Sequence, residues 1–301
     1  MSRPLVSIIS VNYNQEAVTL DMLSSLSVYK DPLEVIVVDN GSVNNPEKEI
    51  LRQFPDTIFI RSDENLGFAG GNNLGIDRAT GKYLFFINND TEITEGLIEC
   101  LVDFMENNES AGGVSPKIHY FDEPGVFQFA GFKRINILTG RNSTIGTFEK
   151  DDHQYDEVAM TPYLHGAAMM IRNEAIQRAG KMPEEFFLYY EELDWSESIA
   201  HTGYELYYVP CGMIRHKESV STGKNSPLKT YYLNRNRILF MRRNHKWLSR
   251  SIFLLFYSVI SIPVNLLRHI FKGEREHANQ LLKAYLWNFS HEGRVNGRYK
   301  Y

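Results

Sequence analysis

The pattern of apolar and polar positions is most regular in the first third of the chain. Short, nearly continuous apolar runs end in polar or acidic residues, and segments with apolar residues three or four positions apart separate them. Continuous apolar runs indicate strands buried on both faces, and the wider spacing indicates helices. The predicted strands are Leu5–Val11, Glu34–Val38, Thr57–Ile60 and Tyr83–Ile87, and the predicted helices are Ala17–Tyr29, Pro46–Gln53 and Gly70–Ala79.

This alternation predicts an α/β fold with a doubly wound, Rossmann-like, mainly parallel sheet and helices on both faces. Later in the chain the pattern predicts helices at Glu95–Asn107, from Asn173 as N-cap to Gly180, and at Glu191–Thr202, with strands at Gly113–Ser115 and Leu206–Val209. The segment Lys117–Met160 gives no clear assignment. From Ser226 onward the pattern predicts a helical C-terminal extension.

Composition adds the class of protein and its compartment. The chain has 301 residues, of which 43% are hydrophobic and 23% charged, which is ordinary for one large or two smaller globular domains. The two cysteines, Cys100 and Cys211, show neither metal-site spacing nor a disulfide framework, which favours a reducing compartment. The N-terminus lacks the apolar core of a signal peptide. We therefore expect a cytoplasmic protein.

Charge and hydropathy single out the C-terminal region. The net charge is -5, but Arg215–Arg250 contains ten Lys/Arg and one acid, Glu218. Such a segment is either a solvated helix face or a surface for an anion: a phosphate group, a lipid surface or nucleic acid. Ile252–Leu267 is strongly apolar, yet shorter than the roughly 20 residues of a membrane span. We expect it either to lie on the inner face of the cell membrane or to pack on the main domain.

Candidate chemistry lies first at the strand ends. Asp39 and Asp90 each follow a buried strand, and ligands of open parallel sheets bind at the carboxyl ends of strands. Asp90 has the chemistry of a hard-cation ligand, although either acid alone could simply cap a helix. The Gly-rich segment Asn65–Asn73 precedes a helix and could hold an anion or form a plain turn. No glycine follows the first strand, which argues against a dehydrogenase.

A second candidate group lies downstream. Glu191, Glu192 and Asp194 open a predicted helix beside aromatic residues, which could raise the pKa of an acid into the range of a general base. The alternative is a favourable charge at the positive end of a helix. His216 could bind a metal or a phosphate, or be a structural histidine.

Five segments in this order resemble family 2 glycosyltransferases with the GT-A fold, most of all the bacterial rhamnosyltransferases that build surface polysaccharide. They are Ser7–Asn14, Val37–Ser42, Asn65–Asn73, Phe86–Asp90 and Tyr189–Asp194. The resemblance covers about Leu5 to Asn244. It implies a catalytic domain at residues 1–225, with a nucleotide-binding half at about 1–116 and an acceptor half at about 117–225, followed by the extension at 226–301.

The resemblance also implies roles for matching residues. Asp39 matches the acid that contacts the nucleotide base. Asp90 matches the last, metal-binding acid of the DxD motif, whose first position is Asn88 here, and His216 resembles a metal- or diphosphate-contacting histidine. Asp194 matches the catalytic base, with Glu191 and Glu192 as neighbouring registers. Further donor contacts are expected at Asn12, Asn14, Asn65, Gly67, Gly71, Asn72 and Asn89.

Two more segments resemble parts of this family. His165-Gly166-Ala167 is similar to its acceptor-side segment, and Tyr231-Tyr232 with Arg235-Asn236 is similar to a stretch that recurs in the rhamnosyltransferase branch.

The implied reaction is inverting transfer of a sugar from a nucleotide-diphosphate donor, with Mg²⁺ or Mn²⁺ as cofactor. The branch favours dTDP-rhamnose, a UDP-sugar being the alternative, and a saccharide or lipid-linked saccharide as acceptor. We expect no nucleic-acid partner, and the oligomeric state stays open. The rival hypotheses are a catalytically silent nucleotide-sugar-binding protein, a nucleotidyltransferase and a membrane scaffold.

Overall fold

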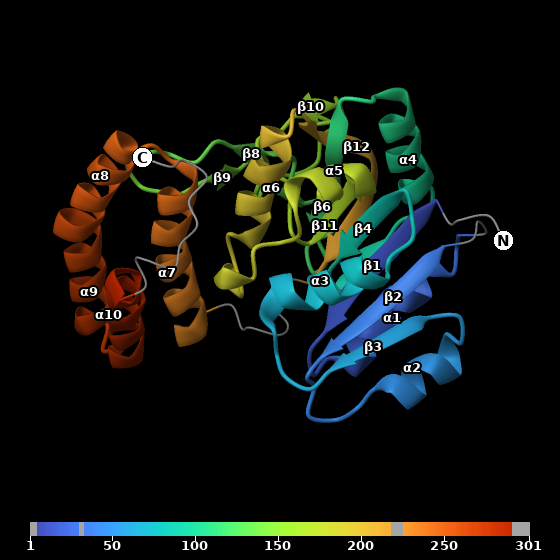
Figure 1. Ribbon diagram of the computed structural model, residues 1–301, viewed down its shortest axis with the longest axis horizontal. Helices are drawn as coiled ribbons and strands as arrows, with labels where there is room; N and C mark the ends of the chain where they lie inside the picture. The colour runs from blue at the N-terminus through green and yellow to red at the C-terminus, as the bar shows by residue number, and fades with distance from the viewer. Residues whose placement is uncertain (1–4, 30–32, 218–224, 291–301) are drawn as a thin grey trace.

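The computed structural model describes residues 5–29, 33–217 and 225–290, which form one sheet-centred body and a helical bundle beside it (Figure 1). The strands are β1 Val6–Asn12, β2 Glu34–Asn40, β3 Ile58–Ser62, β4 Tyr83–Ile87, β5 Thr91–Ile93, β6 Ala111–Tyr120, β7 Phe127–Phe129, β8 Phe132–Lys133, β9 Ser143–Thr144, β10 Ala159–Met160, β11 Ala168–Arg172 and β12 Glu205–His216. The α-helices are α1 Glu16–Leu26, α2 Glu47–Gln53, α3 Gly67–Arg78, α4 Leu97–Asn107, α5 Asn173–Ala179, α6 Glu191–His201, α7 Pro227–Asn244, α8 Trp247–Phe256, α9 Ile262–Phe271 and α10 Arg275–Ser290. A 3₁₀ turn, η1, covers Glu184–Phe186, and a π turn, η2, covers Tyr257–Ser261.

The first half of the chain confirms the predicted doubly wound arrangement. The main path of the ten-stranded sheet runs β10-β12-β6-β11-β4-β1-β2-β3, and β1, β2, β3 and β4 are mutually parallel. Its strands β1, β2 and β4 are almost wholly buried, because helices cover both faces of the sheet. The register pairs Asn12 with Asp39 and Asp39 with Arg61, so three polar residues meet where the strands end.

The second half departs from a purely parallel pattern. β11 is antiparallel to both of its neighbours, β4 and β6. The helix after it, α5, begins at Asn173, whose side chain donates to the Gly81 carbonyl instead of capping the helix. β12 continues well past Val209 through an irregularity and ends at His216, where it pairs with β5. The unassigned segment Lys117–Met160 contains the end of β6 and four short strands.

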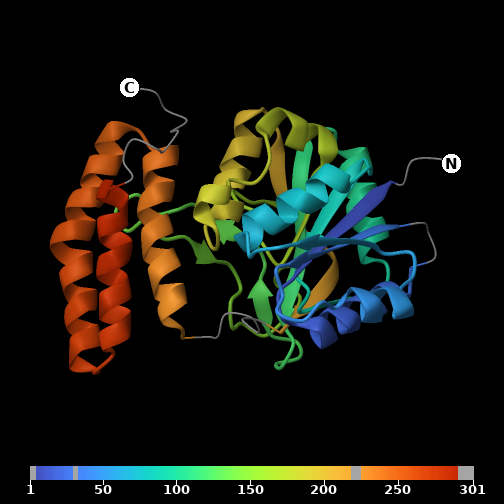
Figure 2. The ribbon, with the colours of Figure 1, turned by 60° about the horizontal axis from the view of Figure 1, so that its bottom comes forward.

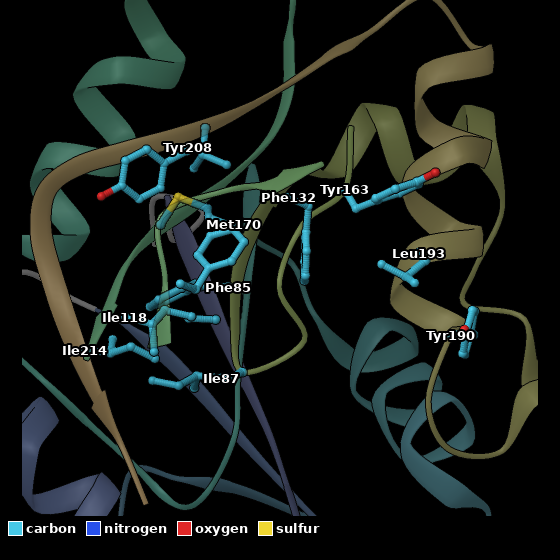
Figure 3. Close-up of a cluster of buried hydrophobic side chains, with 14 of the residues drawn as sticks. Phe85, Ile87, Ile118, Phe132, Tyr163, Met170, Tyr190, Leu193, Tyr208 and Ile214 are labelled. Carbon is cyan, nitrogen blue, oxygen red and sulfur yellow. The ribbon is translucent and has the colours of Figure 1, made fainter. Parts of the chain in front are cut away.

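The core fills the space on both sides of the sheet. On one side Phe85, Met170 and Tyr208 from three strands pack together, while Tyr163 and Leu193 continue the apolar cluster towards α6 (Figure 3). A second cluster on the other side includes Phe86 and Trp195, whose rings meet edge to face at 5.3 Å between centroids. Two buried faces explain why the strands carry apolar residues at successive positions.

The expectation of two unpaired cysteines is wrong for this structure. Cys100 of α4 and Cys211 of β12 are joined in a disulfide, with their Cα atoms 6.3 Å apart. They lie 111 residues apart in sequence, so their spacing gives no sign of the pairing. The contact exists because α4 packs against β12.

Helices α7 to α10 form a bundle at one end of the molecule (Figure 2). The side chain of Ser226 caps α7 by accepting the Lys229 backbone N–H, and α10 packs along α7. The apolar segment forms a longer helix than predicted, because α8, η2 and α9 run continuously over Trp247–Phe271. The π turn directly precedes the first turn of α9, where Pro263 cannot donate a backbone hydrogen bond.

Candidate functional site

Asp90 and His216 come together at the carboxyl end of β4. Asp90 lies between β4 and β5, and β5 pairs with the end of β12 so that Thr91 is opposite His216. Asp90 Oδ1 and His216 Nε2 are 3.0 Å apart, and both side chains are almost fully buried. The structure thus joins the two residues that the sequence assigned to a metal, although they are 126 positions apart.

The hydrogen bonds around this pair leave Asp90 Oδ1 and His216 Nε2 facing each other. His216 Nδ1 lies 2.7 Å from Gln128 Oε1, which can only accept, so Nδ1 carries a proton, while Nε2 lies 3.3 Å from Asn88 Nδ2 and faces Asp90. Asp90 Oδ1 is buried without a hydrogen-bond partner. A buried carboxylate oxygen without a donor is costly unless a cation or a proton lies between it and the imidazole nitrogen.

This donor set fits a divalent cation. Octahedral Mg²⁺ binds ligands at about 2.1 Å, so two neighbouring ligands at a right angle are about 3.0 Å apart. The Asp90–His216 separation equals that value. Carboxylate oxygen and imidazole nitrogen also suit Mn²⁺, and the Gln128 contact fixes the ring as an outer partner of a metal ligand does.

A second acidic cluster, Asp151, His153 and Asp156, is a weaker candidate for the ion. Its ligand atoms lie within 4.8 Å of one another. However, the Lys117 ammonium is already 2.9 Å from Asp151 and 2.5 Å from Asp156. Because this cation already pairs with both carboxylates, the cluster has less to gain from a metal.

Asp39 is built into the end of β2 with every oxygen satisfied. Its carboxylate accepts from Asn12 Nδ2 at 2.8 Å and Ser42 Oγ at 2.5 Å, and pairs with Arg61 at 2.9 Å. Asn12 and Asn14 belong to the same network, since both also bond to Ser42. In this structure Asp39 orders the loop at the ends of β1 and β2. To contact a nucleotide base, its carboxylate would have to exchange one of these hydrogen-bond partners.

The Gly-rich segment follows β3 and includes the first turns of α3, and its side chains bond to the end of β2. Asn65 Oδ1 accepts from Gly67 N–H at 2.9 Å, and Asn40 bonds to both Asn65 and the Gly67 carbonyl. Gly67 has φ +74°, and a Cβ there would lie 2.3 Å from the Phe187 carbonyl oxygen. A Cβ on Gly71 would lie 2.8 Å from Val11, so this glycine lets α3 approach β1.

Two of the predicted donor contacts are buried asparagines that already bond within the protein. Asn72 is buried and donates to the Phe68 carbonyl. Asn89 is buried and donates to Thr19 Oγ1 of α1 at 3.0 Å, which fixes the turn that carries Asp90. Each bond accounts for its residue structurally, and contact of either with a donor stays a prediction.

The assignment of Asp194 as the base does not fit the structure. Asp194 is fully buried (0% exposed) and points to α7, where Arg243 Nε and Asn244 Nδ2 donate to Oδ1 at 3.0 and 2.6 Å. A fully buried carboxylate bonded to a guanidinium and an amide is held away from a substrate proton. No local pattern around Asp194 indicates this pairing, because Arg243 and Asn244 lie about fifty positions away.

Glu191 and Glu192 are better placed and better tuned for proton transfer. One oxygen of each, Oε2, is buried without a hydrogen-bond partner. Burial raises the pKa of Glu192 to about 7 and raises the pKa of Glu191 well above its ordinary value, with the charge of Glu192 adding to the second shift. A carboxyl that titrates near neutrality is suited to general-base catalysis.

The loop before α6 is held in an unusual conformation. Phe187, Tyr189 and Tyr190 all have positive φ, between 62° and 74°. Asn236 Nδ2 lies 2.7–2.8 Å from the carbonyls of Phe186, Leu188 and Tyr189. A buried amide from α7 therefore offsets the backbone strain directly in front of Glu191.

The segment His165–Ala167 connects the two candidate groups. Gly166 lies against the Glu192 side chain, since a Cβ on this glycine would be 3.8 Å from Glu192 Cγ. The Ala167 carbonyl accepts the Asn88 N–H at 3.0 Å, and the ring of His165 is 6.4 Å from that of His216. Burial, aided by His216, lowers the pKa of His165 to about 3, so this ring is neutral. Glu192 and the Asp90–His216 pair therefore flank one short segment.

The sequence model described as "Glycosyl transferase family 2" matches residues 7–179 of this chain. An N-acetylglucosaminyl-diphospho-decaprenol L-rhamnosyltransferase of Mycobacterium tuberculosis is 22% identical over 263 residues, covering 80% of this chain and 85% of the relative. A dTDP-rhamnosyl transferase of Shigella flexneri is 25% identical over 271 residues, covering 83% and 84%.

Solved structures give the same fold. A Pyrobaculum calidifontis mannosyltransferase, solved with GDP-Man and Mn²⁺, has a TM-score of 0.60 at 17% identity and covers 96% of this chain and 88% of its own. Staphylococcus aureus TarS with UDP-GlcNAc has a TM-score of 0.55 at 17% identity, covering 93% and 80%. The predicted GT-A fold with a helical C-terminal region is thus confirmed.

Proposed function

The chain belongs to glycosyl transferase family 2, in a branch similar to bacterial rhamnosyltransferases, and from this premise we propose its reaction. It transfers a sugar, with inversion, from a nucleotide-diphosphate donor to a saccharide or lipid-linked saccharide in surface polysaccharide synthesis. The observation that carries the proposal is the position of Glu192 and the Asp90–His216 pair on either side of His165–Ala167. A base and a cation site so arranged suit displacement at a sugar carbon between them.

Glu192 is the base in this mechanism. Its carboxylate accepts the proton of the acceptor hydroxyl as that oxygen attacks the anomeric carbon from the face opposite the diphosphate, and the sugar is inverted. Glu191 is buried beside it, and burial together with the charge of Glu192 raises the pKa of Glu191 well above its ordinary value, which disfavours two adjacent charges.

Asp90 and His216 hold the divalent cation, which supplies charge neutralisation for the leaving diphosphate. The donor nucleotide lies over the ends of β1 and β2, where Asn12, Asn14, Asp39 and the turn at Asn65 order the surface. Residues 1–116 then serve the nucleotide and 117–225 the acceptor, with 1–4, 30–32 and 218–224 outside the described residues.

The donor we favour is dTDP-rhamnose, because the Shigella relative is named a dTDP-rhamnosyl transferase and the Mycobacterium relative an L-rhamnosyltransferase. A UDP-sugar is the second candidate. A thermal-shift screen of nucleotide sugars with Mg²⁺ and Mn²⁺ ranks them, since a ligand of the native state raises its stability.

The apolar helix suggests that the acceptor is reached at a membrane. Trp247–Phe271 is long and apolar enough to cross one, but only 17% of its most apolar window is buried in the protein. Both of its ends continue into helices α7 and α10, which pack together, so we propose that it lies on the inner face of the membrane of a cytoplasmic enzyme.

The test of the function is Glu192→Gln. We expect transfer to fall about 10³-fold, because a positioned base contributes 10²–10⁴-fold, while donor affinity stays unchanged. Sugar release from labelled donor measures the rate and a thermal shift measures donor binding. Glu197→Gln on the same helix is the matched control and keeps its activity.

Three outcomes separate the rival functions. A wild-type protein that binds donor without turnover supports the silent binding protein. One that forms nucleotide sugar from a nucleoside triphosphate supports the nucleotidyltransferase. If the wild type transfers sugar and Glu192→Gln does so at the same rate, the assignment of Glu192 as the base is wrong, but the transferase function stands.

A further inference from the structure

Arg237 and the loop that carries Arg141 lie beside Tyr190, the residue just before α6, and Arg268 lies near Arg141. Arg141 lies in the β8–β9 loop, Arg237 on α7 and Arg268 on α9. Repulsion from Arg237, followed by burial, lowers the pKa of Arg141, and Arg268 acts in the same direction. Arg141 is therefore close enough to both of the other arginines to be repelled by them, although the three come from separate elements.

Arg237 is the most unusual of the three. Its side chain is almost completely buried (7% exposed), and its Nε donates to Tyr190 Oη at 3.3 Å. The Tyr257 ring lies 5.7 Å from its guanidinium carbon. Within residues 5–29, 33–217 and 225–290, no carboxylate forms an ion pair with Arg237, Arg141 or Arg268. A buried guanidinium without an acid is costly, so the position calls for an anion.

The surroundings of Arg237 hold it in place. Tyr190 Oη donates to the Gly140 carbonyl at 2.9 Å, which draws the β8–β9 loop against α6. Gly140 has φ +63°, and a Cβ there would lie 2.8 Å from Arg237 Cγ and 2.7 Å from the Phe253 ring. The loop that carries Arg141 thus reaches Arg237 only because residue 140 is a glycine.

These arginines lie between the segment that carries the proposed base and the exposed apolar helix. Tyr190 directly precedes Glu191 and Glu192 in the chain, and Arg268 belongs to the exposed apolar helix. An anion held here has the proposed base on one side and the apolar helix on the other. Residues 219–273 contain no Asp or Glu, so nothing in this stretch of sequence opposes the anion.

We propose that Arg141, Arg237 and Arg268 bind the phosphate or diphosphate group of a lipid-linked acceptor. The forked guanidinium donors match phosphate oxygens, the lipid chain follows the apolar face of α8–α9, and the sugar reaches Glu192. This inference rests on the proposed function, in which the acceptor is a lipid-linked saccharide. It names the group of that acceptor that the enzyme binds.

The experiment compares three probes on the full chain: farnesyl diphosphate, farnesol and inorganic pyrophosphate. Excess EDTA is present throughout, so that no diphosphate binds through a metal at Asp90 and His216. Isothermal titration of the wild type should show farnesyl diphosphate binding about tenfold or more tightly than either other probe, because only it offers both chain and charge.

Arg141→Ala, in the β8–β9 loop, should weaken farnesyl diphosphate binding about tenfold, and Arg237→Gln should weaken it further. Arg134→Ala removes the same charge from the same loop and is the matched control, with unchanged affinity. Circular dichroism establishes that each variant is folded.

The results separate the two proposals. The arginine site is overturned if wild type and both variants bind farnesyl diphosphate equally well. It is also overturned if Arg134→Ala loses as much affinity as Arg141→Ala, because the effect would then come from the overall positive charge. Farnesol that binds as tightly as farnesyl diphosphate overturns the site as well, and pyrophosphate that binds as tightly overturns the claim that the lipid chain is recognised. Failure of the wild type to bind dTDP or UDP with Mn²⁺ would instead contradict the proposed function.

Discussion

At the scale of single residues, two acids in the first turn of one helix have opposite environments. Glu192 has an unpartnered buried oxygen and a pKa raised to about 7, whereas Asp194 is neutralised by Arg243. Both lie in the first turn of α6, but they are two positions apart, and two helical steps turn the side-chain direction by about 200°. Burial without a partner makes a base, and burial with a partner makes a structural ion pair.

This difference predicts the pH profile of the enzyme. Glu192 accepts a proton only when it is ionised, so the rate should rise as pH increases through about 7 and then level off. Initial rates between pH 5.5 and 9 at saturating donor measure it. Glu192→Asp should shift the rise and Glu192→Gln should remove it, whereas a profile that is flat in the wild type over this range would exclude the assignment.

The same shift has a consequence for stability. Because the folded-state pKa of Glu192 is raised above the ordinary 4.5, the folded protein binds more protons than the unfolded chain between about 4.5 and 7. Stability contributed by this group is present below that window and lost as pH rises through it. Glu192→Gln should therefore unfold at a higher temperature than the wild type at pH 8, and the two should converge near pH 4.

Asp194→Asn tests the structural role of the second acid. It leaves Arg243 buried without a countercharge, and removing one partner of a buried pair costs about 3–5 kcal/mol. Urea unfolding should show this loss, while the rate per folded molecule in native conditions stays within a few-fold. A stable variant that has lost its chemistry would restore Asp194 as the base.

Asp90 and His216 predict a metal dependence that can be measured without turnover. Asp90→Ala and His216→Ala should each lower Mn²⁺ and donor affinity, because each removes one of two facing ligands. Titration of the donor with Mn²⁺ and with EDTA separates the effects, since the variants and wild type should agree in EDTA. Equal wild-type affinity in both conditions would contradict the metal site.

At the scale of elements, α7 holds the strained loop from outside the segment matched by the family model. That model ends at residue 179, yet Asn236 and Arg235 of α7 collect carbonyls from residues 185–189. Asn236→Ala should release Phe187–Tyr190 from positive φ and lower kcat more than donor affinity. Because Asn236 is fully buried, thermal melting must accompany the kinetics, and Asn234→Ala on the same helix is the control.

The elements were largely predictable from sequence, and the site only in part. Local periodicity gave β4 with its observed bounds and most helices within three residues, because those patterns record burial directly. The resemblance to the family predicted Asp90 and His216 as one metal site. Arg243, which pairs with Asp194, and Gln128, which orients His216, come from segments far away in sequence, and no local pattern indicates such contacts.

At the scale of the whole molecule, the sheet-centred body and the helical bundle face different surroundings. The outward side of α8–α9 exposes large apolar side chains such as Leu255 (68%) and Val259 (64%). Basic residues lie at both ends of this helix, including Lys246, Arg250 and Lys272. A second copy of the same surface would bring like charges together, whereas an anionic lipid surface complements them.

Membrane binding is the last prediction. The full chain should float with vesicles containing phosphatidylglycerol, because apolar area and positive charge act together, and bind neutral phosphatidylcholine vesicles less. Leu255→Glu with Val259→Glu should abolish flotation by placing two charges in the apolar face, while Val43→Glu, an exposed apolar position on the sheet-centred body, should not. Sugar transfer to a soluble acceptor should survive the double substitution and transfer to a lipid-linked acceptor should not.

Equal flotation of the double variant and the wild type would mean that another surface binds the lipid. A wild-type protein that never floats would contradict membrane binding and would favour a protein partner for the apolar helix.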